Sequence, residues 1–229
     1  MKPTTPSSSR WSGTTTTTIA NAVSVAPEAR TAGRRLGRTA RRQSLLHSER
    51  EIFVTQGYHA TGMDDIAERA GVSKPVLYQH FAGKLELYLA LLDAAAHELE
   101  VRLRTALEST SDNSGRVTAC IAAYFDYCSG ASSPYPLILE SDLRMEPAVR
   151  ERVQRHLDIA VSAIAGTIAA DTGAEPPAAQ LLSVGLVGIA ELSARWWLTS
   201  DRSMPQEEAV RLLAALAWRG IGGFPRASC

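Results

Sequence analysis

AGVSKPVLYQHFAGK, residues 70–84, is the stretch that decides which fold to expect. Its middle has room for about two helical turns, and a helix that short is not stable alone in water. Leu77 and Phe81 are four residues apart and share one face of such a helix, whereas Lys74 and Tyr78 share another. We therefore expect a neighbouring helix to cover the apolar face and a binding partner to use the polar face.

The segment before it supplies that neighbouring helix. MDDIAERA, residues 63–70, has a short helical pattern, and Thr61 and Asp64 are spaced as in a capping box with Asp in place of Glu. Gly71 follows as a helix breaker. The small Ala67 lets the two helices approach closely, and the tight turn between them sets a steep angle. This is the layout of a helix-turn-helix.

The polar face of the second helix suits a DNA major groove. Gln79 can hydrogen-bond base edges, and Lys74 and Tyr78 can reach phosphates or bases. The alternative is an ordinary helical hairpin, with Tyr78 and His80 as half-buried spacers. Residues 1–84 carry twelve Lys and Arg against six Asp and Glu, and the remainder carries twelve against eighteen. Such a split is typical of a basic part that meets a polyanion, although chance segregation on solvated surfaces would produce it too.

Residues 57–92, GYHATGMDDIAERAGVSKPVLYQHFAGKLELYLALL, resemble the DNA-binding signature of the tetracycline-repressor (TetR) family of regulators. That signature has the form T-[ST]-x-x-x-I-A-x-x-A-G-V-S-x-x-x-L-Y-x-[HY]-F-x-x-K-x-x-L. The resemblance covers roughly residues 41–90, and the rest of the chain matches only in its helical layout. The matching positions are Thr61, Ile66, Ala67, Ala70, Gly71, Val72, Ser73, Leu77, Tyr78, His80, Phe81 and Lys84.

The resemblance implies that three N-terminal helices bind double-stranded DNA at a palindromic operator. Lys84, at the start of the fourth helix, would grip a backbone phosphate. Gly62 stands where the family usually has Ser or Thr, so one hydroxyl contact to a phosphate is lost, although a backbone N–H of Gly62 or Met63 could replace it. The resemblance places the following positions at DNA: Thr61, Gly62, Ser73, Lys74, Pro75, Tyr78, Gln79, His80 and Lys84. From their charge and their place next to the first helix, we also expect Arg41 and Arg42 to contact DNA.

Helical patterns continue to the C-terminus, and no alternation typical of strands competes with them. The fold class is therefore all-α, with about nine helices. We expect a disordered basic arm at 1–36, a helix-turn-helix DNA-binding domain at 37–84, and a helical effector-binding and dimerisation domain at 85–229. The arm's Arg- and Ser-rich composition also describes an organellar transit peptide. The helical patterns after the DNA-binding domain lie at 85–109, 117–128, 147–170, 177–199 and 205–220.

The resemblance implies that the long helices bind a small-molecule effector, as yet unidentified, and build a two-fold homodimer. Effector candidates are Tyr124, Tyr127, Tyr135, Glu140, Arg144, His156, Arg195 and Trp196. Aromatic residues at helical spacing are equally typical of a protein core. Dimer candidates are Leu181, Gly185, Gly188, Leu192, Trp196, Leu213 and Leu216. The two glycines lie on one helix face and would let a partner helix approach, or would ease packing inside one subunit.

The cysteines, the length of apolar runs and the catalytic motifs limit the classes of function that this chain can have. Cys120, Cys128 and Cys229 are few and widely spaced, so we expect a reduced, cytoplasmic protein without a metal or cofactor. No apolar run approaches the ~20 residues of a membrane helix. His156 with Asp158 or Glu140 could act as acid and base, but no nucleophile elbow, metal-ligand spacing or Gly-rich phosphate loop supports an enzyme. We expect a transcriptional repressor that an effector releases from its operator; an architectural DNA-binding protein is the alternative.

Overall fold

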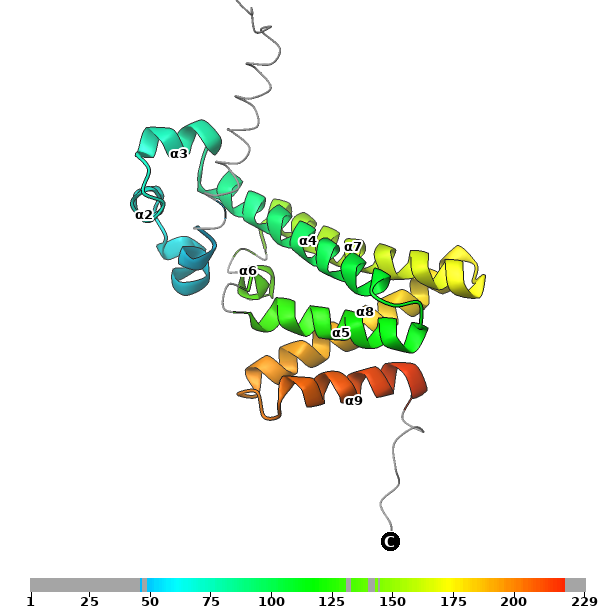
Figure 1. Cartoon of the computed structure of the whole chain (residues 1–229). Coiled ribbons are helices and arrows are strands. Elements are labelled where there is room, and N and C mark those ends of the chain that lie inside the picture. The colour runs from blue at the N-terminus through cyan, green and yellow to red at the C-terminus, as the bar shows by residue number, and fades with distance from the viewer. Residues whose placement is uncertain (1–45, 47–48, 131–132, 140–142, 144, 221–229) are drawn as a thin grey trace, which may run out of the picture. The chain divides into compact units, whose positions relative to one another are not determined.

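The computed structural model describes residue 46 and residues 49–130, 133–139, 143 and 145–220. All regular secondary structure in this part of the chain is helical, which confirms the all-α fold (Figure 1). The predicted arm at 1–36, the basic residues Arg41 and Arg42, and the effector candidates Glu140 and Arg144 lie outside the described residues.

The head consists of a helical segment at residues 49–60, α2 (Met63–Arg69) and α3 (Lys74–His80). The first of these ends at Ala60. The chain turns between α2 and α3 at Gly71, whose φ is +63°. A side chain with a Cβ is disfavoured by about 1–2 kcal/mol in that left-handed region, which explains the glycine.

The apolar faces of the two short helices are buried against each other, as the spacing predicted. Ile66 from α2 and Leu77 from α3 have no exposed surface, and Phe81, just after α3, has none either. Each fully buried aliphatic or aromatic side chain contributes about 1.5–3 kcal/mol to folding. Packing on this core therefore holds two seven-residue helices that would not be stable in isolation.

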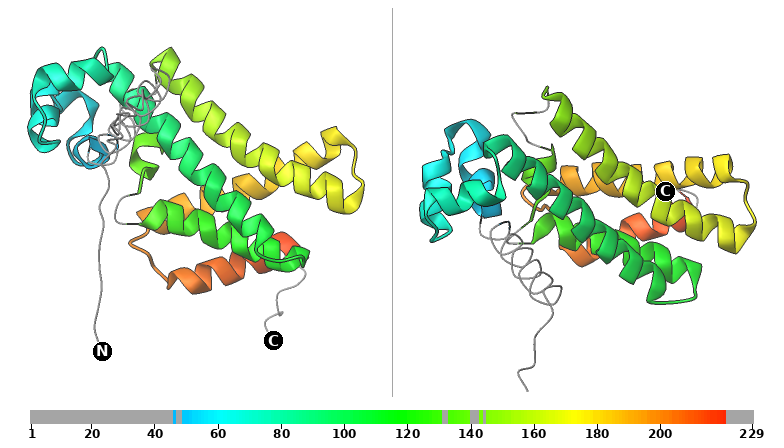
Figure 2. Two further views of the ribbon diagram at one scale, coloured as in Figure 1. Left: turned by 45° about the horizontal axis from the view of Figure 1, so that its top comes forward. Right: turned by 90° about the horizontal axis from the view of Figure 1, so that it is seen from above.

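The helix α4 (Lys84–Glu108) joins the head to the body. Figure 2 shows it leading out of the head and lying beside α7. The Tyr88 ring meets the Phe53 and Tyr58 rings edge-on, with centroids 5.3 and 5.4 Å away. Arg50 pairs with Glu98 at 3.0 Å, further along α4. Aromatic packing and one ion pair thus fix the first helical segment on α4.

The body comprises α4, α5 (Asn113–Ser129), α6 (Tyr135–Leu139), α7 (Pro147–Thr172), α8 (Pro176–Thr199) and α9 (Gln206–Arg219). The helix α4 packs against α5 and α7, α7 packs against α8, and α9 packs against α5 and α8. The short α6 is tied to α4 by the Tyr88 hydroxyl, which donates a hydrogen bond to the Leu137 carbonyl at 2.9 Å.

The start of α5 and the cap of α2 differ from the sequence interpretation. The helix α5 begins at Asn113, four residues before the predicted Val117, because the Asp112 carboxylate accepts a hydrogen bond from the Gly115 N–H at 2.7 Å and caps the N-terminus. In α2 the cap is Gly62, one residue later than the predicted Thr61.

The helix α8 has an unusual distribution of apolar side chains. Leu181, Leu192 and Trp196 are 73%, 64% and 58% exposed, on the side opposite the buried Ser183 and Ala194. Within the described residues α8 is also the one helix long and apolar enough, by length and composition, to cross a membrane. The expectation that no apolar run approaches the length of a membrane helix was wrong for this helix. The same composition fits an apolar face that a partner subunit covers.

Candidate DNA-binding surface and effector pocket

The outer face of α3 is polar and accessible. Ser73, Lys74, Pro75 and Gln79 are exposed, and Tyr78 is 44% exposed. His80 is half-buried at the end of the helix. The predicted base readers therefore lie together on one surface, at the spacing that a recognition helix needs to place side chains along a groove.

Lys74 forms an ion pair on this surface. Its Nζ lies 2.8 and 3.0 Å from the two carboxylate oxygens of Asp64 at the start of α2. The carboxylate raises the pKa of Lys74 by hydrogen bonding and by charge attraction. The lysine thus stays charged at physiological pH, and a DNA phosphate would compete with Asp64 for it.

Thr61, Gly62 and Lys84, which are predicted to contact phosphates, also form hydrogen bonds within the head. Thr61 is buried, and its hydroxyl donates to the Gly57 carbonyl at 2.7 Å. The Gly62 N–H donates to the Asp65 carboxylate at 2.9 Å, so this N–H is not left for a phosphate. In each case the group closes a helix end, where carbonyls or N–H groups otherwise lack partners.

Lys84 is the most completely engaged of the three. Its Nζ donates to the carbonyls of Tyr58 and Thr61, both at 2.8 Å, and lies 4.4 Å from the centre of the Tyr58 ring. Two of its three N–H bonds are therefore used to close the C-terminal end of the first helical segment. The structure gives Lys84 a bracing role between the head and α4.

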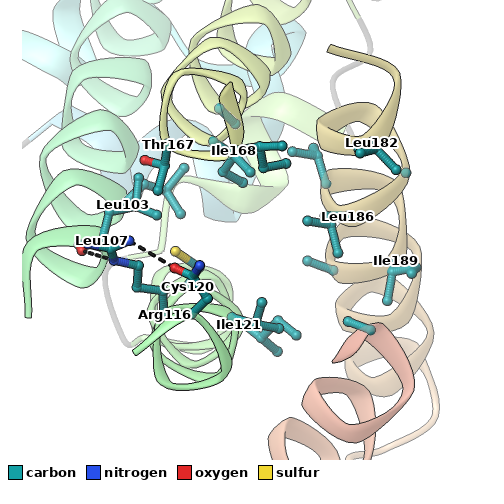
Figure 3. Close-up of a pocket in the computed structure, with 18 of the residues that line it drawn as sticks. Leu103, Leu107, Arg116, Cys120, Ile121, Thr167, Ile168, Leu182, Leu186 and Ile189 are labelled. Atoms are coloured by element: carbon teal, nitrogen blue, oxygen red, sulfur yellow. Dashed lines mark hydrogen bonds between the residues drawn. The ribbon is translucent and has the colours of Figure 1, made fainter. Parts of the chain in front are cut away.

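The body contains a large apolar pocket of about 550 Å³. Figure 3 shows side chains from α4, α5, α7 and α8 converging on it, and Trp218 of α9 adds to the lining. Its walls are mainly Leu, Ile and Val, and its volume lies within the range typical of small-molecule sites. The apolar lining comprises Leu103, Leu107, Val117, Ile121, Ala160, Ile164, Ile168, Leu181, Leu182, Leu186, Val187, Ile189, Ala190, Ala217 and Trp218.

Polar side chains gather where α5 begins and α7 ends. Arg116 and Asp171 form an ion pair there. Asn113 and Thr172 lie beside them in the lining. Cys120 lines the pocket as well, and burial raises the pKa of its thiol to about 11, so the thiol stays protonated at neutral pH.

The predicted effector residues separate into two groups. Tyr124 lines the large pocket, and it also lines a small recess of about 10 Å³ together with Tyr127, Tyr135 and His156. The recess is closely packed: the Tyr127 ring lies 5.7 Å from that of His156, and the Tyr127 hydroxyl donates to the Ala95 carbonyl at 3.1 Å. Burial lowers the pKa of His156 to about 4. These residues therefore behave as core, apart from Tyr124.

Arg195 and Trp196 lie on another part of α8 and do not line the large pocket. Arg195 faces Glu191 at 3.9 Å. Trp196 lies in a separate groove between α8 and α9. The residues that do form the pocket were missed because aliphatic residues at helical spacing are the usual signal of a core.

Most of the predicted dimer residues lie on one face of α8, and the other two lie on α9. A Cβ added at Gly185 or Gly188 would meet no heavy atom within 4 Å. Packing inside one subunit therefore does not require glycine at either position. Leu213 is half-buried in the groove that contains Leu192 and Trp196, and Leu216 is half-buried on α9. Leu181 and Gly185 also line the large pocket.

Comparison with known proteins identifies the family to which this helical arrangement belongs. Residues 45–91 match the model of the bacterial regulatory proteins of the tetR family. The HTH-type transcriptional activator FasR of Mycolicibacterium smegmatis is 45% identical over 193 residues, which cover 84% of this chain and 88% of FasR. This chain belongs to the TetR family. The helix-turn-helix of α2 and α3 is therefore that of a DNA-binding transcriptional regulator.

Two solved structures share most of the fold. FadR from Bacillus subtilis, crystallised in complex with stearoyl-CoA, superimposes with a TM-score of 0.62 at 17% identity and covers 78% of this chain and 98% of its own. AibR, in complex with isovaleryl coenzyme A and operator DNA, gives a TM-score of 0.57 at 16% identity, covering 77% and 97%. At these identities the likeness establishes the fold.

Proposed function

We propose that this TetR-family protein is a cytoplasmic homodimer that binds a palindromic operator through α3 and is released from it by an acyl thioester bound in the body. The observation that carries the proposal is the apolar pocket of about 550 Å³ enclosed by the body helices. A cavity with such walls favours a ligand with a hydrocarbon chain, because burying its surface supplies the affinity.

The chemistry of related regulators supports this class of ligand. FadR was crystallised with stearoyl-CoA, and AibR was crystallised with isovaleryl coenzyme A and operator DNA. Both ligands join an acyl chain to coenzyme A through a thioester. In this chain the acyl group would lie among the leucines and isoleucines of α4, α7 and α8, with the coenzyme outside the pocket.

The sign of regulation depends on where the operator lies relative to the promoter. We propose repression, in which the bound protein blocks the promoter and the effector relieves the block. FasR, 45% identical, carries the name of an activator, and the same release would then switch transcription off. Transcription in vitro from the regulated promoter, with and without the protein, separates the two signs.

We propose that side chains on the exposed face of α3 recognise the base sequence of the operator. A bidentate contact to a base edge contributes about 1–3 kcal/mol of discrimination. Gln79→Ala should therefore relax the preference at one or two operator positions per half-site, measured by binding to a library of operator variants. If the full specificity profile stays the same, Gln79 does not read a base.

The release itself is tested with the full chain bound to DNA from upstream of its own coding sequence. Hexadecanoyl-CoA should raise the dissociation constant of the complex, measured by fluorescence anisotropy. Ile168→Trp, on the pocket wall, should reduce this response while operator binding without ligand persists. Ser162→Trp, on the exposed side of the same helix, is the matched control and should respond like the wild type. No response of the wild type would refute an acyl thioester as the effector.

The other two interpretations make different predictions in the same experiment. An architectural protein would bind DNA but would not be released by any ligand. An enzyme would convert its ligand, and the acid–base candidate His156 would then need contact with substrate. His156 is instead only 4% exposed in a closely packed recess, which favours a binding protein.

A further inference from the structure

The charged side chains of the large pocket cancel each other. Among its described lining residues, Arg116 and Asp171 alone carry a charge at neutral pH, and they form an ion pair. We propose that this pair makes the pocket select acyl derivatives whose buried part is uncharged, such as thioesters, esters and alcohols, against free fatty acids. The inference deepens the proposed effector class and rests on it.

The guanidinium of Arg116 is held from several sides. Its Nε donates to the carbonyls of Leu107 at 3.1 Å and Thr110 at 2.9 Å. Its Nη1 donates to the Asn113 side-chain oxygen at 2.8 Å and to the Asp171 carboxylate. Figure 3 shows Arg116 beside Leu107 at the edge of the cavity. A ligand carboxylate would have to compete with Asp171 for the positive charge of Arg116.

The position of each charge in its helix explains why the pair is stable. Arg116 lies in the first turn of α5, near the positive end of the helix dipole, and Asp171 lies in the last turn of α7, near the negative end. Both positions disfavour the charge that occupies them. Each charge therefore depends on the other, and separation of the pair would leave two ions that are unfavourable where they stand.

A carboxylate drawn into the apolar part of the pocket would lose hydration, and it would find Arg116 already paired with Asp171. Burying an ionised carboxylate without a partner is strongly unfavourable. A thioester or hydroxyl carries no net charge, so it avoids this loss. The pocket also offers uncharged polar groups at the same end, among them Asn113 and Thr172. The Arg116–Asp171 pair thus acts as a specificity-determining element.

The test compares ligands of equal chain length on the full-length protein. Dodecanoate, dodecan-1-ol and dodecanoyl-CoA are titrated by calorimetry at pH 8, where the free acid is ionised. The wild type should bind the alcohol and the thioester at least about tenfold more tightly than dodecanoate. Asp171→Asn removes the competing charge, and it should raise dodecanoate affinity about tenfold through a charge-assisted contact to Arg116, with alcohol binding changed by less than about twofold.

Asp158→Asn is the matched control, since Asp158 lies exposed on the same helix outside the pocket. It should leave all three affinities at their wild-type values. Equal wild-type affinity for dodecanoate and dodecan-1-ol would overturn the inference. An unchanged preference of Asp171→Asn for the alcohol over dodecanoate would overturn it as well. Neither result would contradict the proposed acyl effector. If Asp171→Asn does not fold, Asp171→Ser replaces it, and the wild-type comparison decides without any variant. Failure of all three probes to bind would instead overturn the proposed acyl effector and this inference with it.

Discussion

At the scale of single residues, the head shows that a side chain matching a DNA-contact motif can serve the scaffold instead. Thr61, Gly62 and Lys84 all match or adjoin the motif, yet each closes a helix end. Lys74, Tyr78 and Gln79 remain on the outer surface. The two sets differ in what a substitution should change, either folding stability or DNA binding.

Lys84→Met should lower the free energy of unfolding by about 2 kcal/mol, because two charge-assisted hydrogen bonds to partly buried carbonyls are lost. Denaturant unfolding followed by circular dichroism measures this change. Lys74→Ala serves as the comparison, since its exposed pair with Asp64 should leave the midpoint unchanged while DNA binding weakens. If Lys84→Met has wild-type stability and only its DNA binding is weaker, the result would favour the predicted phosphate contact over a role in stability.

His156 should make stability depend on pH. Its pKa is about 4 in the folded chain, because burial disfavours the imidazolium, against 6.5 as the ordinary value. Between these two values the unfolded chain binds a proton that the folded chain does not, so this stabilising term is complete above pH 6.5 and is lost as the pH falls toward 4. From pH 7 to pH 5 the loss should be about 2 kcal/mol.

The measurement is denaturant unfolding of the wild type and His156→Gln at pH 7 and pH 5. The variant is expected to be less stable at pH 7, but its stability should fall by about 2 kcal/mol less between the two pH values. Equal pH dependence of the two proteins would show that His156 is not the group responsible.

At the scale of helices, the turn between α2 and α3 depends on the backbone of one glycine. Nothing lies within 4 Å of a Cβ added at Gly71, so a substitution there creates no clash. Its φ of +63° is nevertheless strained for any residue with a Cβ. Gly83, at the start of α4, has equally open surroundings but an extended φ of −175°.

Gly71→Ala should therefore destabilise the protein by about 1–2 kcal/mol, whereas Gly83→Ala should change stability by less than about 0.5 kcal/mol. Thermal unfolding of both variants isolates the backbone cost, because neither site has a neighbour to clash with. Gly71→Asn should recover part of the loss, since Asn tolerates the left-handed region better than Ala does. Equal stability of the two alanine variants would contradict this account.

The body helices show how one surface can have two uses. Leu181 and Gly185 were predicted at the dimer interface, and both line the effector pocket. On a helix of 3.6 residues per turn, the exposed stripe through Leu181, Gly185, Gly188 and Leu192 lies next to the face that borders the pocket. Effector binding and subunit contact would therefore meet along one edge of α8.

At the scale of the whole molecule, the exposed apolar face of α8 supports the proposed homodimer. Two heads on a two-fold axis double the base contacts and require a palindromic operator. Gly188→Leu should lower the dimer fraction and the operator affinity together, because the new side chain occupies the space of the partner helix. Helical content should stay at the wild-type level, since no heavy atom within the subunit lies within 4 Å of the added Cβ.

Sedimentation velocity at micromolar concentration measures the dimer fraction, and anisotropy on the full palindrome and a half-site measures affinity. Gly166→Leu is the matched control: it lies on α7, is exposed and has equally open surroundings. That variant should behave like the wild type. A monomeric wild type that binds one half-site as tightly as the palindrome would refute the dimer.

The local pattern of residues 61–84 was enough to predict the helix-turn-helix. Turn chemistry at Gly71, the buried pair Leu77 and Phe81, and the polar face of α3 all depend on neighbours within a few residues. The all-α class followed from helical spacing over the rest of the chain. Such short-range features are determined by backbone geometry and side-chain periodicity, which the amino-acid sequence contains directly.

Tertiary structure alone decided where the large pocket lies and which carbonyls accept hydrogen bonds from Lys84. The pocket is lined by aliphatic side chains from five helices, and sequence periodicity cannot distinguish a leucine facing a cavity from one facing the core. Arg116 and Asp171 are 55 residues apart in the chain and meet only when α5 packs near α7. Lys84 finds its carbonyl partners 23 and 26 residues earlier. Contacts over such distances arise from the packing of helices, and no local pattern encodes which faces will meet.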